Sequence, residues 1–434
     1  MGVDIEVLRS QSPLDGRVVT ICNGPSVLDG LRESVYVAHL PLKALGFQAN
    51  SVVSLRMLEL GEGGELVEVG GVAGRCHGAL FAIRPAEDGC VHAWVGDEYG
   101  QIIARSTLPG QALSRVSGRK EAGKGIFLRS SKAVKVVDGE APTWASASGM
   151  AWPAPDARTV LVSDAAAFSV RALDLESGAA VTLDSGDHLM HVSHVTLVDE
   201  RVYVFSDYAV LGTRLASAEP LALAAPFTIV AGPSGPALGH ADGRGAQVLL
   251  EYPALVQSLQ CVGDTRTLVF ADGAGCGFWR VRVLDTRTDD VRTLCGDGSI
   301  VSLSSQKIDR SELATESREL RPWLPPGPYI GSMAVLAHLM PPVLLVAVRP
   351  HFGSRTTSLH KIPLWGWVHW RPERHHMFPL PVRAAIETVL IIAKRREADS
   401  GLGILPLEIV WMIAAAVATA DGWNDARGVE KSNE

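Results

Sequence analysis

The stretch LVFADGAGCGFWRVRVLDTRTDDVRTLCG, from Leu268 to Gly296, contains three short apolar segments separated by turn residues. The first segment ends in Asp272, the second alternates apolar and polar residues at 280–283, and the third ends in glycine. Alternation with a period of two is typical of a β-strand with one buried face. We therefore expect three consecutive antiparallel strands joined by tight turns.

The glycine-ending strand recurs along the chain at intervals of about 46 to 68 residues, the range of one four-stranded propeller blade with its loops. Its copies are RVVTICNG (17–24), ELVEVGG (65–71), ALSRVSG (112–118), AVTLDSG (180–186), FTIVAG (227–232) and VRTLCGDG (291–298).

The aspartate-ending strand recurs as well, and its last residues are Asp97, Asp164, Asp207 and Asp272. Because each aspartate holds the same place in its own repeat, a structural role is favoured over a catalytic or metal-binding one. A carboxylate at a strand end typically accepts hydrogen bonds from backbone N–H groups of the following turn.

These repeats predict an all-β propeller over residues 1–365, with about six four-stranded blades and five or seven as alternatives. Residues 331–364 supply early strands of a blade without a glycine-ending one. We therefore expect residues 17–24 to complete the last blade, because such closure removes unpaired strand edges. The alternative is two unrelated sheets.

The span from Phe227 to Gly296 resembles an NHL repeat. The matching elements are the A-G at its start, the H-A-D-G-R-G loop at 240–245, the Tyr252-Pro253 step and the V-F-A-D strand end. The R-V-R-V strand and the V-R-T-L-C-G close complete the match, and the other repeats match only in strand pattern. The resemblance implies a propeller that serves mainly as a binding platform for protein or RNA, although a few relatives are enzymes.

Composition narrows the partners and the compartment. The 434 residues carry a net charge of −7, which argues against nucleic acid as the main partner. The six cysteines form no C-x-x-C pair and the N-terminus lacks an apolar signal core, so the cytoplasm, or alternatively the nucleus, is expected. The longest apolar stretches, 333–348 and 404–420, are too short or too interrupted to span a membrane. We expect no cofactor.

Only weak signs of enzymatic chemistry occur. His188, His191 and His194 are the best metal-ligand candidates, but on a strand the middle one would point away from the other two. The phosphate-loop-like stretch 118–124 is followed by Gly125 instead of Ser or Thr, and by a strand-like segment instead of a helix. The enzymatic alternative is a metal-dependent, lactonase-like hydrolase or a lyase.

The C-terminal part has a different character. Residues 366–380 are a linker rich in tryptophan and histidine, residues 381–422 predict a pair of apolar helices, and residues 423–434 predict a disordered tail. The L-P-L-E-I-V sequence at 405–410 resembles the start of an F-box and the end of a SOCS box. This resemblance implies docking to a Skp1-like or elongin-like adaptor through Leu405, Pro406, Leu407, Ile409, Val410 and Ile413.

Together these patterns predict a non-enzymatic protein-interaction scaffold. In its sharper form it is a substrate receptor of a cullin-type ubiquitin ligase, with the propeller loops holding the target protein and the C-terminal helices holding the adaptor. Packing of the helices on the propeller, self-association through them, a purely structural or assembly role, and the propeller enzyme remain the alternatives.

Overall fold

The computed structural model of the chain describes residues 6–7, 14–25, 33–41, 53–60, 66–74, 80–85, 91–96, 101–108, 114–118, 134–154, 156–234, 239–251, 253–260, 266–273, 280–295, 329–336, 343–349, 356–363, 384 and 386–388. These residues are mostly β-structure, arranged in antiparallel sheets built on units of four strands. No helix among them is long and apolar enough to cross a membrane.

The first and last described strands join in one sheet of eight, in the order β24-β25-β26-β2-β3-β4-β5, with β1 paired to β26. Their bounds are β24 Tyr329–Leu336, β25 Val343–Arg349, β26 Thr356–Pro363, β1 Glu6–Val7, β2 Leu14–Pro25, β3 Glu33–Pro41, β4 Val53–Leu60 and β5 Leu66–Gly74.

Two four-stranded sheets follow along the chain. The first contains β6 Leu80–Pro85, β7 Val91–Gly96, β8 Ile103–Leu108 and β9 Ser114–Ser117. The second contains β10 Ala147–Ala151, β11 Thr159–Asp164, β12 Ser169–Asp174 and β13 Ala180–Ser185, with the short 3-10 turns η2 Ala165–Ala167 and η3 Asp187–Leu189 after β11 and β13.

The remaining two sheets have five strands each, four in the common pattern and one short addition. One contains β14 His194–Val198, β15 Arg201–Phe205, β16 Val210–Ala218, β17 Leu221–Leu223 and β18 Thr228–Ala231. The other contains β20 Ala254–Gln260, β21 Arg266–Asp272, β22 Arg280–Asp285 and β23 Asp290–Cys295, and the two-residue strand β19 Gly243–Arg244 lies on the free edge of β23.

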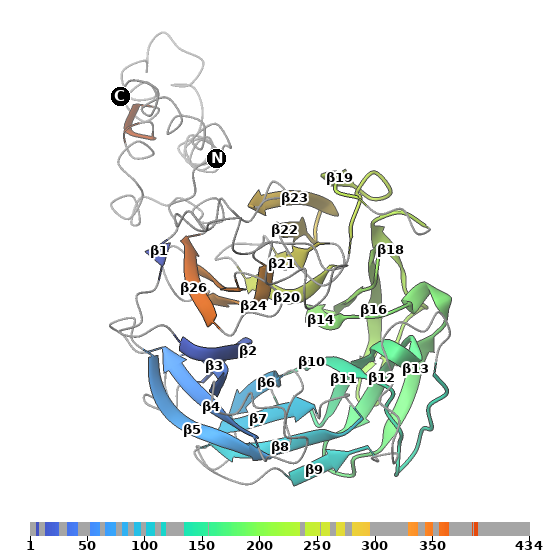
Figure 1. The fold of residues 1–434 in the computed structure, drawn as a ribbon. Helices are drawn as coiled ribbons and strands as arrows, with labels where there is room; N and C mark the ends of the chain where they lie inside the picture. The colour runs from blue at the N-terminus through green and yellow to red at the C-terminus, as the bar shows by residue number, and fades with distance from the viewer. Residues whose placement is uncertain are drawn as a thin grey trace, which may run out of the picture.

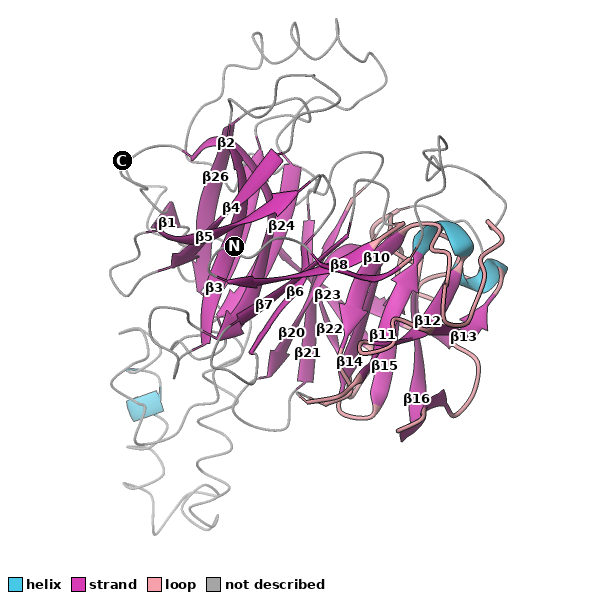
Figure 2. Cartoon of the chain, turned by 90° about the horizontal axis from the view of Figure 1, so that it is seen from below, coloured by secondary structure: helices cyan, strands magenta, loops and turns pink. Residues whose placement is uncertain are grey.

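The first strands of successive four-stranded units lie next to one another. β2 contacts β6, β6 contacts β10, and the series continues through β14, β20 and β24, which contacts β2. Figure 1 shows the units following one another in chain order. In the view of Figure 2 the 3-10 turns lie together beside β12 and β13, at one end of the strands.

A β-bulge recurs between the third and fourth strands. It places one extra residue of the fourth strand opposite the third, and it gives five of the units the same local kink. It falls between Met57 and Leu58, Ile103 and Ala104, Val170 and Arg171, Val210 and Leu211, and Val281 and Arg282.

The expected glycine-ending strands are confirmed in five places, because β5, β9, β13, β18 and β23 each follow the third strand of their unit. The copy at 17–24 differs. It pairs with β3, so it belongs to the first strand of its own unit, and only Leu14 and Asp15 of β2 pair with β26. The difference arises because β3, the next strand along the chain, pairs with β2 from Gly16 to Pro25.

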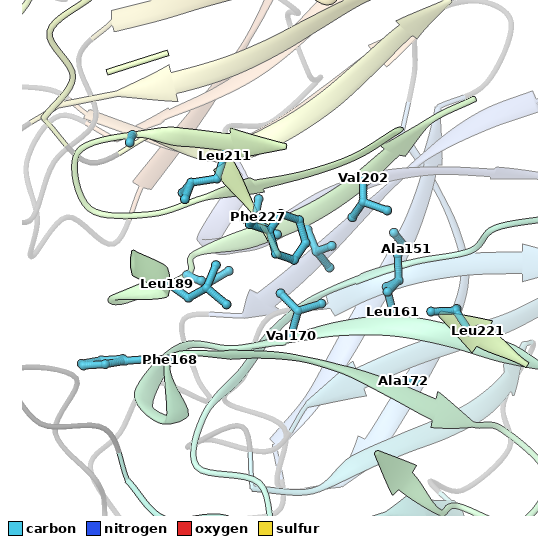
Figure 3. Packing of buried hydrophobic residues seen from close by; sticks show 14 residues of the cluster. Ala151, Leu161, Phe168, Val170, Ala172, Leu189, Val202, Leu211, Leu221 and Phe227 are labelled. Atoms are coloured by element: carbon cyan, nitrogen blue, oxygen red, sulfur yellow. The ribbon is translucent and has the colours of Figure 1, made fainter. Parts of the chain in front are cut away.

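Hydrophobic packing between neighbouring sheets forms the core. Between the β10–β13 and β14–β18 sheets, Leu161 and Val170 face Val202, Leu211 and residues around them, all buried (Figure 3). Burial of apolar area contributes about 25 cal/mol per Å². Alternating apolar residues of adjacent sheets therefore hold the units together face to face.

Candidate functional site

Three of the four strand-end aspartates lie in the described part of the chain, and all three are buried. Asp164 ends β11, Asp272 ends β21, and Asp207 follows β15 by two residues. Asp97 lies outside the described residues. Two of the three are held by an arginine of the third strand, and the third is held by a histidine.

Arg171, in β12, is fully buried and is held at both ends of its guanidinium group. Its Nη1 donates to the carbonyl oxygen of Thr143 at 2.6 Å and lies 3.6 Å from Asp164 Oδ2. Its Nη2 donates to the carbonyl oxygen of Val137 at 2.8 Å and to Asp138 Oδ1 at 2.7 Å. The guanidinium also stacks on the Trp144 ring at 4.3 Å. The charge is therefore balanced by two carboxylates.

Asp138 links this network to the outer strand β13. Its carboxylate accepts the N–H group of Thr182 at 2.9 Å and the Thr182 hydroxyl at 3.0 Å. The next residue, Gly139, exchanges backbone hydrogen bonds with Ala180. The segment before β10 thus covers the free edge of β13, which would otherwise expose unpaired backbone groups.

The same arrangement recurs in the β19–β23 sheet. Nη1 of the buried Arg282 donates to the Leu249 carbonyl at 2.6 Å and to Asp272 Oδ2 at 3.0 Å. Nη2 donates to the Ala241 carbonyl at 2.7 Å and to Asp242 Oδ1 at 2.9 Å.

Asp242 then accepts the backbone N–H and the hydroxyl of Thr293 at 2.9 and 2.8 Å. The following residue, Gly243, pairs with Val291 as part of β19. The A-D-G loop that carries the NHL resemblance is therefore an edge-covering segment. Its second copy is V-D-G at 137–139, where the sequence matches the H-A-D-G-R-G loop only in the Asp-Gly step.

Burial and hydrogen bonding act on the carboxylates in opposite directions. Burial raises the pKa of Asp164 and of Asp272, against the lowering effect of backbone N–H groups and of the arginine beside each. For Asp138 and Asp242, partial burial also acts to raise the pKa. There the threonine N–H, the threonine hydroxyl and the arginine prevail and hold the pKa below its ordinary value.

The β14–β18 sheet lacks this network, and the arginine, the threonine and the Asp-Gly segment are all replaced there. By the register at the common bulge, Leu211 takes the place of the arginine and Ile229 the place of the threonine. The connection at 186–193, between β13 and β14, contains no Asp-Gly segment. A fully buried arginine without a carboxylate partner is strongly destabilising, so an apolar residue replaces it where the loop is missing.

The donors to the aspartates differ from the expected ones. The N–H groups of Ala145 and Ser146 reach Asp164, and the N–H group of Glu251 reaches Asp272, at 2.6 to 3.1 Å. These donors precede the first strand of the unit instead of following the second. The cause is the antiparallel pairing, which sets the start of β10 beside the end of β11, with Ala147 opposite Asp164.

The three candidate metal histidines do not converge. The ring of His188, in η3, is partly exposed and lies 3.2 Å from Asp184 Oδ2, whereas Nδ1 of His191 lies 2.6 Å from Asp207 Oδ2. His194 begins β14, and burial lowers its pKa to about 4. Among the described residues, no three His, Cys, Asp or Glu side chains come together as a metal site requires.

His191 and Asp207 form a close polar pair outside the arginine networks. His191 has a left-handed backbone, with φ of 51°, and its ring meets Phe168 edge-on at 5.2 Å. Burial raises the pKa of Asp207, while the hydrogen bond and the charge of His191 act to lower it. This pairing fixes the orientation of the imidazole ring.

Serine side chains link the first strands of successive units. Ser148, in β10, donates to the Val192 carbonyl oxygen at 2.8 Å. Ser193, just before β14, donates to the Pro253 carbonyl oxygen at 2.7 Å. Each hydroxyl thus spans from one unit to the start of the next.

No protein-family model matches the chain, and no curated protein matches it in sequence. Its structural neighbours include β-propellers. A protein of unknown function from Bacteroides thetaiotaomicron is 10% identical over 82% of this chain and 75% of its own, with a TM-score of 0.45. Virginiamycin B lyase from Staphylococcus aureus is 10% identical over 83% of this chain and 99% of its own, at 0.39. The WD40 β-propeller domain of Doa1 is 10% identical over 82% and 97%, at 0.41.

Most of the region 366–434 lies outside the described part of the chain. This includes the expected adaptor-binding residues Leu405, Pro406, Leu407, Ile409, Val410 and Ile413. Within that region, residues 384 and 386–388 are helical and Ile386 is buried. The described geometry therefore concerns the β-sheets.

Proposed function

We propose that the chain forms a closed propeller of six blades, built from NHL-like repeats. The cyclic order of contacts among the six first strands supports closure. The pairing of β1 and of Leu14 and Asp15 with β26 supports a last blade completed by N-terminal residues. The shared bulge and the two matching arginine networks support a common repeat.

We propose further that this propeller is a non-enzymatic scaffold that binds a protein target. The observation that carries this proposal is the engagement of its buried acids. Asp164 and Asp272, for which the sequence favours a structural role over a catalytic one, bind arginines and backbone N–H groups of their own sheets. Such groups rigidify the blades, and the loops between strands remain for recognition.

The sharper proposal adds a cullin-type ubiquitin ligase. It rests on the F-box-like and SOCS-box-like sequence from Leu405 to Ile413. In this proposal the C-terminal helices bind a Skp1-like or elongin-like adaptor, and the propeller presents the target to the ligase. An apolar helix of this composition requires a partner surface in any case.

Affinity purification tests both parts. The full-length chain is purified beside a version ending at Arg371, and the proteins that accompany each are identified. An adaptor and a cullin found only with the full-length chain support the receptor proposal, and proteins found with both chains are candidate targets. A full-length chain without an adaptor, together with an insoluble shortened chain, would overturn it, because the helices would then belong to the fold.

One observation favours a second candidate, a propeller enzyme of the hydrolase or lyase class. The carboxylate of Asp207 orients the His191 ring, an arrangement that also serves a general base or a metal ligand. One equivalent of metal in the purified protein, lost on His191→Ala or His194→Ala, supports this candidate. Absence of stoichiometric metal after purification in metal-supplemented medium counts against its metal-dependent form.

A further inference from the structure

Arg84 is a half-buried arginine near the end of β6, a first strand of the proposed ring. Its guanidinium group lies over the ring of Trp152, at 4.6 Å from the ring centre. Trp152 follows β10 directly, so the contact joins the ends of two neighbouring first strands. The stacking holds the guanidinium by its face, and its N–H groups lie in the plane at the edge.

Arg84 differs from the buried arginines elsewhere in the described residues. Arg171 and Arg282 each meet two aspartates, and Arg280 lies 3.3 Å from Glu251 Oε2. No described carboxylate pairs with Arg84. Burial lowers the pKa of Arg84, and no ion pair with another described residue acts in the opposite direction. Buried charges in proteins are normally paired, so this position lacks one negative charge.

The surroundings of Arg84 add positive charge and aromatic surface. The register places Arg84 opposite His92, and His92 opposite Thr107, whose hydroxyl lies 3.1 Å from His92 Nδ1. In the next row of the same face, Arg105 lies over the ring of Trp94 at 5.5 Å.

The rings of Trp94 and Trp152 meet edge-on at 6.1 Å. Two stacked cations thus flank one aromatic pair at the seam between the β6–β9 and β10–β13 sheets.

We propose that Arg84, stacked on Trp152, is the centre of an oxyanion-binding site at this seam. The ligand group is a carboxylate or a phosphate. It supplies the negative charge that aspartates supply beside Arg171 and Arg282. The fork of N–H groups in a guanidinium matches two oxygens of such a group. Arg105 adds attraction from the same face. The site lies in the β-sheets and does not depend on the proposed adaptor docking.

Isothermal titration of the full-length protein tests this site. The probes are inorganic phosphate and acetate, each titrated at constant ionic strength with chloride as the balancing anion. The variants are Arg84→Gln and Arg84→Lys, and the matched control is Arg115→Gln, an exposed arginine of β9 in the same sheet.

We expect saturable binding of at least one probe by the native protein and by the Arg115→Gln variant. Arg84→Gln should weaken it by about tenfold or more, because hydrogen bonds to charged groups are the strong ones. Arg84→Lys should give an intermediate loss, since lysine keeps the charge but not the planar fork. Tighter binding of phosphate or of acetate shows whether the site prefers a phosphate or a carboxylate ligand.

Three results would overturn the proposal. The first is no saturable binding of either probe in the millimolar range. The second is equal binding by Arg84→Gln and native protein. The third concerns Glu87 and Asp88, which follow β6 in the sequence. If anions bind only after Glu87→Gln and Asp88→Asn substitution, Arg84 has an acid of its own chain as partner. Should Arg84→Gln not fold, the lysine variant alone decides between the first two outcomes.

Discussion

Replacing Arg282 with leucine tests whether the buried arginine networks stabilise their blades. Arg282 is fully buried, and Asp272, its partner at 3.0 Å, is equally inaccessible to solvent. The substitution removes the cation and leaves the Asp272 carboxylate buried, with the Glu251 N–H group as its remaining donor. Removing one partner of a buried ion pair costs about 3–5 kcal/mol. We expect Arg282→Leu to lower the free energy of unfolding by this amount.

Two companion variants separate the buried pair from the exposed one. Combining Arg282→Leu with Asp272→Asn removes both charges, so the double variant should be more stable than the sum of the single effects by about 1–3 kcal/mol. Asp242, whose side chain is 47% exposed, pairs with the same arginine. Because solvent screens this contact, Asp242→Asn should cost about 1 kcal/mol or less.

Urea denaturation followed by fluorescence and circular dichroism measures these differences, provided that the slope of unfolding against urea is unchanged among the variants. The reasoning is refuted if Arg282→Leu costs less than about 1 kcal/mol, or if the Arg282 and Asp272 effects are additive.

Three further predictions concern other positions. Unfolded histidine takes up a proton near pH 6.5, whereas folded His194 does so only near pH 4. The native protein should therefore lose up to about 2 kcal/mol of stability between pH 7 and pH 5, and the His194→Gln variant should not show this loss. Equal pH profiles of the urea midpoints for the two proteins would contradict this. Gly178→Ala should lower Tm more than Gly139→Ala. Both glycines have positive φ, but of the two only Gly178 would bring an added Cβ against a carbonyl oxygen of β9. The reverse order of Tm would contradict this close approach. Ser193→Ala should cost about 1 kcal/mol by loss of its hydrogen bond to Pro253, measured by urea unfolding, and no loss would mean that the contact contributes nothing.

The strand pattern was predictable from the sequence because the repeated segments carry local signals. Period-two alternation at 280–283 and the strand-ending Asp272 identified β21 to β23, and the same signals identified β11 to β13. The role of 17–24 was not predictable in this way. Its composition is that of the other glycine-ending strands, and only its pairing with β3 distinguishes a first strand from a fourth one.

The arginine networks were not predictable from the sequence pattern. The V-D-G segment at 137–139 corresponds to the A-D-G segment at 241–243, and Arg171 and Thr182 have the same spacing as Arg282 and Thr293. An arginine in an alternating strand predicts a solvent-facing side chain, so the pattern alone does not indicate that these arginines are buried. The burial of Arg171 depends on two carboxylates far away in the sequence, and no local pattern contains that information.

Direct binding of purified adaptors to the full-length chain tests the receptor proposal most sharply. The protein is titrated with a Skp1-like adaptor and, separately, with an elongin-like one, and Leu407→Asp is compared with Leu402→Asp as the matched control. We predict that one adaptor binds and that Leu407→Asp weakens binding by at least about 2 kcal/mol, roughly thirtyfold, while the control does not. Binding of neither adaptor, or equal binding by both variants, would contradict the account.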